Sequence, residues 1–224
     1  MTHHRWTSVG IGAAALACAI VVSTTGGASA APTGEITTYT GTVTSASCLE
    51  QVRKVAAQTG SDRAEGESLC SGTVRVTETT AQKVTASEVA SIGKEQRLTV
   101  AETDVLRRTA ANGGIYYRDW THSYWVGGLT EKHTGRTYWD GHHAWNASYR
   151  GFKGSHTCHS EGGLAIGWSV EPISCPKPGP RTSADAYYRF DASAVFKGSP
   201  VTLNIGLHNK TSATGKVTLW QVGG

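Results

Sequence analysis

No stretch of this sequence is apolar for long enough to cross a membrane as a helix. The longest apolar run, from about Val9 to Val22, falls short of the roughly 18 residues that such a helix needs. Arg5 precedes the run and Ala28-Ser29-Ala30 follows it, which is the layout of a secretory signal peptide. The sequence therefore predicts that residues 1–30 are removed on export, and that the remaining chain is secreted, extracellular and without a membrane anchor.

Clusters of basic residues are missing as well. The chain has 21 Lys and Arg residues against 17 Asp and Glu residues, and both kinds are scattered along its length. Nucleic-acid binding depends on a concentrated positive surface that neutralises several phosphates. This composition therefore argues against nucleic acid as a partner.

Pairs of cysteines two to four residues apart, which structural zinc sites use, do not occur. An even number of cysteines remains after the predicted cleavage, and in an exported chain this predicts disulfides. Several pairings are open, and we favour neighbours because each bridge then closes a loop of roughly 20 residues. The expected disulfides are Cys48–Cys70 and Cys158–Cys175, and we expect no metal and no cofactor.

Aromatic residues are scarce in the first half of the exported chain. Tyr39 stands alone before Asn112, whereas aromatic residues are dense between Tyr116 and Phe152. This change in composition divides the chain into two segments. We expect residues 31–112 to form a small α+β N-terminal unit and residues 113–224 to form an antiparallel β domain.

The N-terminal segment contains signals for both strands and helices. "EITTYTGTVT" and the alternating "TVRVTETT" have the composition of strands. Ser47 and Glu50 have the spacing of a capping box, and the helix that they begin is expected to end at Gly60. The same spacing recurs at Thr85–Glu88 and at Thr99–Glu102, where two further helices are expected.

The C-terminal segment has the period-two alternation of strands with one buried face. "LAIGWSV", "YYRFDA" and "VTLNIGLH" each place apolar and polar residues on opposite faces. Turn signals recur at short intervals, among them His133-Thr134-Gly135, Asp140-Gly141 and Gly162-Gly163. The sequence therefore predicts a mainly β protein, with an antiparallel β-sandwich or partly open barrel in this segment.

The stretch "WDGHHAWNASYRGFKGSHTCH" raises the question of a metal or catalytic site. If Asp140-Gly141 forms a two-residue hairpin turn, His142 and His143 point to opposite faces of one strand. They then cannot bind one ion together, and His156 and His159 diverge in the same way. No Gly-x-Ser-x-Gly motif occurs. We therefore assign no catalytic residue, and His142, His159 and Asp140 are the candidates should the protein be a hydrolase with a His/carboxylate pair.

The aromatic residues give a second hypothesis. In a strand through residues 116–126, Trp120 and Tyr124 share one face, and Tyr117 and Trp125 share the other. Unless the N-terminal segment covers that second face, some of these rings are exposed. Exposed Trp and Tyr rings suit sugars or a protein partner. The candidate binding residues are Trp120, Trp139, Trp145 and Tyr149.

Several stretches together resemble small exported proteins of high-GC Gram-positive, actinobacterial type, a group without a characterised activity. They are "ASAAP", "SCLEQV", "TYWDGHHAWNASYRG", "GSHTCHSEGGLAIGWSV" and "YYRFDASAVFKGSPVTL". The resemblance implies secretion and a β-rich, disulfide-bonded domain, and it implies no activity and no site residues. We expect a secreted, non-enzymatic binding or structural protein whose partner is a polysaccharide or an extracellular protein. The alternatives are the hydrolase and a secreted inhibitor or toxin-like interaction protein.

Overall fold

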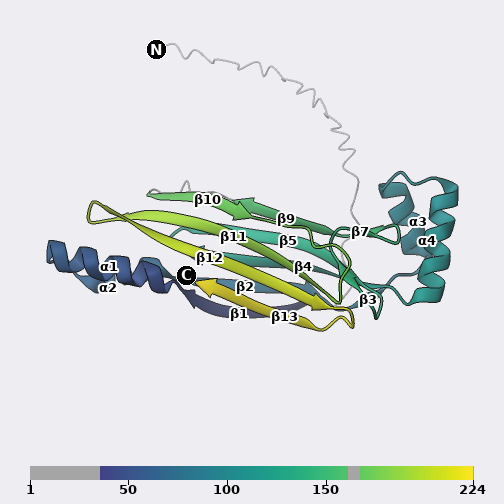
Figure 1. The fold of residues 1–224 in the computed structure, drawn as a ribbon, viewed down its shortest axis with the longest axis horizontal. Helices are drawn as coiled ribbons and strands as arrows, with labels where there is room; N and C mark the ends of the chain where they lie inside the picture. The colour runs from purple at the N-terminus through teal and green to yellow at the C-terminus, as the bar shows by residue number, and fades with distance from the viewer. Residues whose placement is uncertain (1–35, 161–166, 224) are drawn as a thin grey trace, which may run out of the picture. The chain divides into compact units, whose positions relative to one another are not determined.

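Two antiparallel sheets face each other in this protein (Figure 1). The computed structural model describes residues 36–160 and 167–223, which belong to one compact unit. The predicted signal peptide, the Gly162-Gly163 turn and the beginning of the predicted "LAIGWSV" strand lie outside the described residues. The predicted fold class, mainly β with antiparallel sheets and two disulfides, is confirmed.

The larger sheet has seven strands, in the order β1-β2-β4-β5-β6, with β3 paired to β4 and β9 paired to β5. Its strands come from both predicted segments of the chain. Strands β1, β2 and β3 precede Asn112, and the other four follow it. The two segments therefore share one sheet. The bounds are β1 Ile36–Thr44, β2 Ser71–Thr79, β3 Gln82–Lys83, β4 Tyr116–Val126, β5 Leu129–Trp139, β6 Ala144–Trp145 and β9 Ser155–Ser160.

The smaller sheet has four strands in the order β10-β11-β12-β13, and a separate short pair is formed by β7 and β8. The predicted alternation in β11 and β12 is confirmed, because Tyr188 and Phe190 of β11 are fully buried, as are Val201, Leu203, Ile205 and Leu207 of β12. The bounds are β7 Ser148–Tyr149, β8 Phe152–Lys153, β10 Trp168–Ser174, β11 Ser183–Phe196, β12 Ser199–Ser212 and β13 Val217–Gly223.

The apolar core lies between the two sheets at the end where α1 packs. Tyr124 and Leu129 of the larger sheet meet Phe190 and Leu203 of the smaller one, and Val52 of α1 joins them. Burial of large apolar side chains of this kind stabilises a fold by about 1.5–3 kcal/mol each.

The helices begin where their capping residues predict, with one correction. Both Thr-x-x-Glu capping boxes are present, at Thr85 and at Thr99. The first helix begins two residues earlier than predicted, because Ser45 rather than Ser47 accepts the Cys48 backbone N–H. The helices are α1 Ala46–Thr59, α2 Arg63–Glu67, α3 Ala86–Glu95 and α4 Val100–Gly113, with a 3-10 turn, η1, at Ser68–Cys70.

Helices α3 and α4 cover one end of the outer face of the larger sheet. Val89 and Leu106 of these helices pack with Tyr117, Tyr138 and other apolar residues in a second core cluster. The N-terminal segment therefore covers part of the second aromatic face of β4, and Tyr117 is buried there.

The turn between β4 and β5 lies at Gly127-Gly128, where both residues have positive φ. The predicted turn at His133-Thr134-Gly135 is wrong, because these residues lie within β5. Two consecutive positive φ angles are what a two-residue hairpin turn requires, and glycine adopts them without a steric cost.

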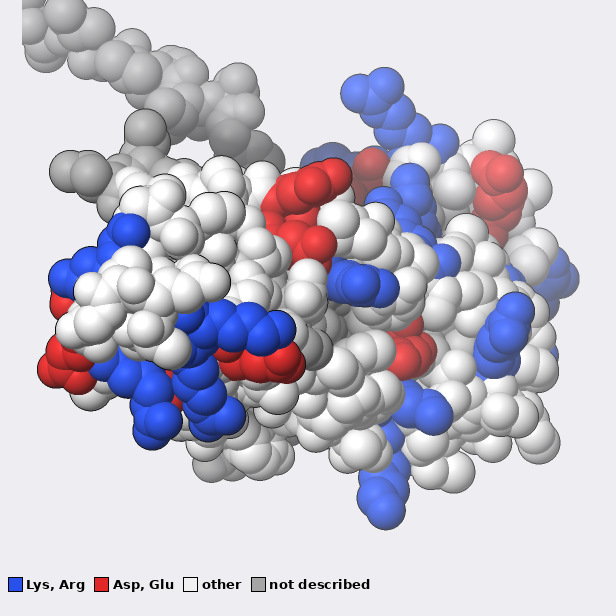
Figure 2. Space-filling model, turned by 60° about the vertical axis from the view of Figure 1, so that its left-hand side comes forward, with Lys and Arg blue, Asp and Glu red and all other residues white. Residues whose placement is uncertain are grey.

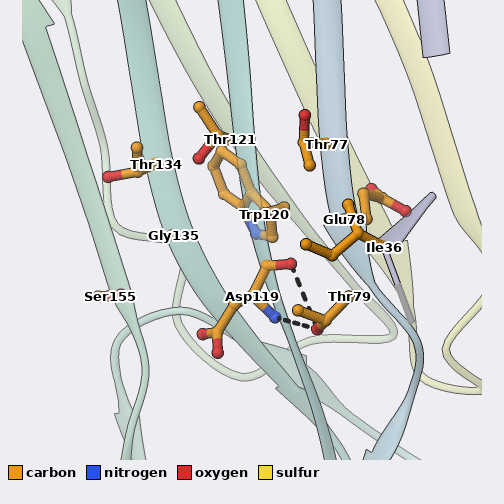
Figure 3. A pocket seen from close by; sticks show the side chains of 10 residues that line it. All are labelled: Ile36, Thr77, Glu78, Thr79, Asp119, Trp120, Thr121, Thr134, Gly135 and Ser155. Atoms are coloured by element: carbon orange, nitrogen blue, oxygen red, sulfur yellow. Dashed lines mark hydrogen bonds between the residues drawn. The ribbon is translucent and has the colours of Figure 1, made fainter. Parts of the chain in front are cut away.

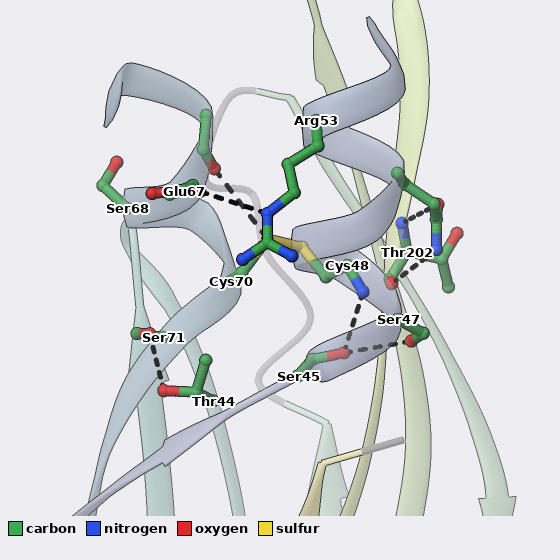
Figure 4. The surroundings of a disulfide bond; sticks show 12 residues. Thr44, Ser45, Ser47, Cys48, Arg53, Glu67, Ser68, Cys70, Ser71 and Thr202 are labelled. Carbon is green, nitrogen blue, oxygen red and sulfur yellow. Dashed lines mark hydrogen bonds and ion pairs between the residues drawn. A yellow bond between two sulfur atoms is a disulfide. The ribbon is translucent and has the colours of Figure 1, made fainter. Parts of the chain in front are cut away.

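Both predicted disulfides are confirmed. Cys48–Cys70 joins the first turn of α1 to η1, and both cysteines are fully buried (Figure 4). Cys158–Cys175 joins β9 to the segment that follows β10, and Cys175 is exposed. Two disulfides indicate an oxidising compartment.

Charged side chains of both signs are interspersed on the face shown in Figure 2, with uncharged areas between them. Several form pairs on the helices, for example Lys54 with Glu50 and Arg63 with Glu67. No helix in the described parts of the chain is long and apolar enough to span a membrane.

Gly135 allows the Trp120 ring to lie directly on β5. A Cβ atom at Gly135 would collide with that ring and would lie 2.6 Å from the Ser155 carbonyl oxygen. We expect Gly135→Ala to lower the free energy of unfolding by about 1–3 kcal/mol, because the core must shift to admit the methyl group. Gly41→Ala is the control, since its Cβ would meet only a Val74 methyl at 3.4 Å. Urea denaturation measures both, and equal midpoints would contradict the close packing.

Candidate functional site

The predicted aromatic binding surface is not exposed. Trp120, Trp139 and Trp145 are 3%, 4% and 0% exposed, and only Tyr149 is half-buried. Trp120 and Trp145 use their indole N–H groups internally, on the Thr137 hydroxyl and on the Phe152 carbonyl. The expectation that these tryptophans present flat faces to a ligand is therefore wrong. Trp120 lies between the two sheets, and Trp145 is covered by the core cluster that includes helices α3 and α4.

Asp140, His142 and His143 form a loop rather than the predicted two-residue turn. Trp139 pairs with Ala144, so four residues connect the strands. The Asp140 carboxylate accepts the backbone N–H groups of His142 and His143 at 3.0 and 2.7 Å and also binds Arg150. Burial acts to raise the pKa of Asp140, but these hydrogen bonds hold it below its usual value. Asp140 therefore stabilises the loop.

The two histidines that were candidates for catalysis are exposed. The His159 ring lies 3.4 Å from the Thr134 hydroxyl. Among the described residues, no carboxylate lies within ion-pair distance of His142 or His159; the neighbour of Asp140 is His143, at 3.7 Å. The structure therefore does not bring the three predicted catalytic candidates together.

A row of threonines crosses the outer face of the larger sheet. Strand pairing places each threonine directly opposite the next one, on five successive strands. Neighbouring strands are about 4.8 Å apart, so the row extends for roughly 19 Å. All five side chains are exposed or half-buried. The threonine row consists of Thr38, Thr77, Thr121, Thr134 and Thr157.

An open depression of about 340 Å³ lies along the centre of the threonine row (Figure 3). Thr79, Asp119 and Ser155 also line it. The Asp119 carboxylate is bound by two nitrogens of Arg136, at 2.7 and 2.9 Å, so its charge is balanced. The threonine and serine hydroxyls thus share the lining of the depression with apolar groups such as Ile36, and Trp125 lies half-buried on the same face of β4.

Three histidines lie on the opposite, inner face of the same strands. His122 on β4, His133 on β5 and His156 on β9 are each at most 1% exposed. His122 and His133 are directly opposite each other, with ring centroids 5.2 Å apart, and the His133 and His156 rings are 5.1 Å apart. They form a continuous row of imidazoles between the two sheets, beside Trp120.

The hydrogen bonds determine the tautomers of two of these histidines. The Pro176 carbonyl can only accept, so His156 Nδ1 carries a proton and donates to it at 2.5 Å. The neutral His156 ring then accepts at Nε2, and His133 Nδ1 donates to it at 2.9 Å. His133 Nε2 therefore keeps a bare lone pair, and it makes no hydrogen bond with the described residues.

Burial keeps the three inner histidines neutral. It lowers the pKa of His122 to about 3, and His208 acts in the same direction. It lowers the pKa of His133 well below 6.5, helped by the other histidines. For His156, burial lowers the pKa, although the hydrogen bond to Pro176 opposes it. An imidazolium ion here would lose its hydration without gaining a carboxylate partner.

One group of potential metal ligands occurs in the described parts of the chain. The ligand atoms of His133, His156 and Cys158 all lie within 4.8 Å of one another. The Cys158 sulfur is bonded to Cys175, however, and only a thiolate is a metal ligand. In the oxidised protein these residues therefore form a hydrogen-bonded cluster beside a disulfide.

A His–carboxylate pair that the sequence analysis missed lies on the outer face of the smaller sheet. His208 Nδ1 lies 3.1 Å from the Asp185 carboxylate. The His208 ring is stacked between Tyr187 and Trp220, with centroids 5.2 and 4.2 Å away. Both faces of the His208 ring are therefore covered, one by Tyr187 and the other by Trp220.

Hairpin symmetry could have revealed much of this arrangement from the sequence. Gly-Gly is a strong hairpin signal, and a turn at Gly127-Gly128 places Thr121 opposite Thr134 and His122 opposite His133. The contribution of β9 and the pairing of His208 with Asp185 depend on strand order, which no local pattern gives.

In comparisons with known protein families, with characterised proteins and with solved structures, no match to the chain was found. The functional argument therefore rests on the site itself.

The inner histidines predict a loss of stability in weak acid. Each has a lowered pKa in the folded state, so the unfolded chain takes up its protons below about pH 6.5. The contribution of each histidine is complete above that pH and falls by up to about 1.4 kcal/mol per pH unit below it, until the pH reaches the pKa of that histidine in the folded state. Between pH 7.5 and 5.5 we expect His122 and His133 together to lower the free energy of unfolding by about 3 kcal/mol, and His156 to add to that loss.

The control for this prediction is His122→Gln, measured by urea denaturation at both pH values. It should show a loss smaller by about 1.4 kcal/mol, because one titrating group is gone. All other titrating groups are the same in the native protein and in His122→Gln, so their effects on stability cancel when the two losses are subtracted. An identical loss in both proteins would show that His122 titrates normally.

Proposed function

We propose that this is a secreted, non-enzymatic binding protein that recognises a polysaccharide through the outer face of its larger sheet. Export is supported by the signal-like N-terminus and by the disulfides that indicate an oxidising compartment. The observation that carries the proposal is the threonine row and the depression along it.

The chemistry of threonine matches that of a sugar chain. Each threonine offers a hydroxyl that both donates and accepts hydrogen bonds, beside a methyl group. A pyranose ring likewise presents hydroxyls at its rim and C–H groups on its faces. Threonine is also stiff at χ1, so a row of threonines loses little conformational freedom when it binds.

The surroundings of the row support a polysaccharide over a nucleic acid or an apolar protein surface. Two carboxylates, Asp119 and Glu78, line the depression, and each is paired with an arginine, Asp119 with Arg136 and Glu78 with Arg118. Trp125 lies on the same face of β4 as Thr121, four residues along the strand, and is half-buried, so part of its ring can contact a sugar. In this proposal the threonine row takes the binding role that the sequence analysis gave to the tryptophans, which are buried.

The test is retention on insoluble cell-wall and plant polysaccharides. Thr121→Val combined with Thr134→Val removes two central hydroxyls and keeps the side-chain shape. Each lost hydrogen bond weakens binding by about 0.5–1.5 kcal/mol, so we expect the affinity to fall about tenfold or more. Thr218→Val, on the exposed edge of β13, is the matched control and should bind as the native protein does.

Each result decides the proposal. Reduced retention of the double variant alone supports it. Equal retention of the native protein, the double variant and Thr218→Val would show that the binding surface lies elsewhere. If the native protein is retained on no polysaccharide, the proposed function is rejected.

A hydrolase remains the second candidate because of the Asp185–His208 pair. A carboxylate orients the imidazole in such a pair and leaves the other ring nitrogen to act as a base. If this candidate holds, the native protein releases reducing ends from one of the same polysaccharides and His208→Gln does not. Release that is absent from the native protein eliminates it.

A further inference from the structure

We propose that reduction of the Cys158–Cys175 disulfide creates a binding site for a zinc-like divalent ion. The ligands are His133 on β5 and His156 and Cys158 on β9. The site is independent of the polysaccharide surface, since these side chains lie on the inner face of the sheet.

Two of the three separations between ligand atoms are already close to the required values, and all three lie within 4.8 Å. A tetrahedral ion with bonds of about 2.3 Å to sulfur and 2.0–2.1 Å to nitrogen separates these two ligand atoms by about 3.6 Å. Cys158 Sγ and His156 Nε2 are 3.6 Å apart. The nitrogens His133 Nδ1 and His156 Nε2 are 2.9 Å apart and need to separate by roughly 0.4 Å.

One of the two histidine ligands already has a supporting group behind it. Histidine ligands of metals generally donate their second N–H to a carbonyl, carboxylate or water. His156 Nδ1 already donates to the Pro176 carbonyl, which leaves Nε2 as a lone pair directed at the site. For His133, the proton moves from Nδ1 to Nε2, which makes no hydrogen bond with the described residues.

The disulfide controls the site, and it is the accessible one of the two. Cys175 is exposed, whereas both Cys48 and Cys70 are fully buried. A thiol reductant must reach a sulfur atom, so Cys158–Cys175 reacts first. Reduction also frees Cys175 to move away, which opens the cluster to solvent on that side.

The chemistry balances with a dithiol as the reductant. The S–S bond takes two electrons and two protons, giving two thiols, and the dithiol is oxidised to its own disulfide. The ion then displaces the Cys158 thiol proton, which is released to water. Three protein ligands leave the fourth position for a water molecule.

The test uses Cys175→Ser, which leaves Cys158 as a free thiol without any reductant. Cobalt(II) is the probe, because thiolate ligation gives it a sulfur-to-metal charge-transfer absorption. We expect one equivalent of cobalt to produce this absorption, and zinc to displace it. The oxidised native protein should show none, and the native protein reduced with a phosphine should behave as the variant does.

Two further variants separate this site from chance binding at surface histidines. Cys158→Ser with Cys175→Ser retains the fold elements but lacks the thiolate, so the absorption should vanish. Adding His156→Gln to Cys175→Ser should weaken cobalt binding at least tenfold, since loss of a ligand exceeds the 10- to 100-fold effect of a supporting group.

The proposal is overturned if Cys175→Ser and the reduced native protein both retain the native circular dichroism and show no charge-transfer absorption. It is equally overturned if the double serine variant binds cobalt as tightly as Cys175→Ser. If Cys175→Ser does not fold, the reduced native protein alone decides, with its oxidised form as the reference.

Discussion

The register of β4 on β5 is the constraint on which both faces of this protein depend. Successive side chains of a strand point to opposite faces, so a slip of one residue would exchange the two sets completely. The Gly127-Gly128 turn fixes this register. It places His122 and His133 between the sheets and Thr121 and Thr134 on the outer face. One two-residue turn therefore specifies both the hydroxyl-rich surface and the polar interior behind it.

A polar layer inside a sandwich is costly unless its groups bind one another. Here most do so. The Tyr188 hydroxyl donates to Glu131 at 2.7 Å, and Asn209 donates to Glu78 at 3.1 Å. Burial raises the pKa of Glu78, while Arg118 and Asn209 oppose that effect. The apolar cluster at the α1 end and the disulfides offset the cost of this layer, because the favourable burial energy is concentrated there.

The sequence predicted those features that depend on local patterns. Period-two alternation identified β11 and β12, Thr-x-x-Glu spacing identified α3 and α4, and loop length gave the disulfide pairing. The errors arose where a side chain overrode a local rule. The Asp140 carboxylate accepts two backbone N–H groups and thereby lengthens a loop that Asp-Gly alone would make a two-residue turn.

The candidate sites were less predictable, because they depend on which strands become neighbours. Aromatic density indicated a binding surface, but the second sheet and helices α3 and α4 bury most of those rings. The threonine row is invisible in the sequence, since its five residues lie on five strands with no common local motif. Hairpin symmetry gives only the pairing of Thr121 with Thr134.

Strand β9 connects the two proposed sites physically. It carries Thr157 on the outer face and His156 and Cys158 on the inner face. Among the described strands it pairs only with β5, and Cys158–Cys175 is its covalent link to the chain beyond β10. An ion bound by His133, His156 and Cys158 would replace that link with one from β9 to β5 itself. β5 carries Thr134, the neighbour of Thr157 in the threonine row, so such an ion would tie the last two strands of the row to each other. With neither the disulfide nor an ion, the pairing of β9 with β5 would depend on hydrogen bonds and side-chain packing.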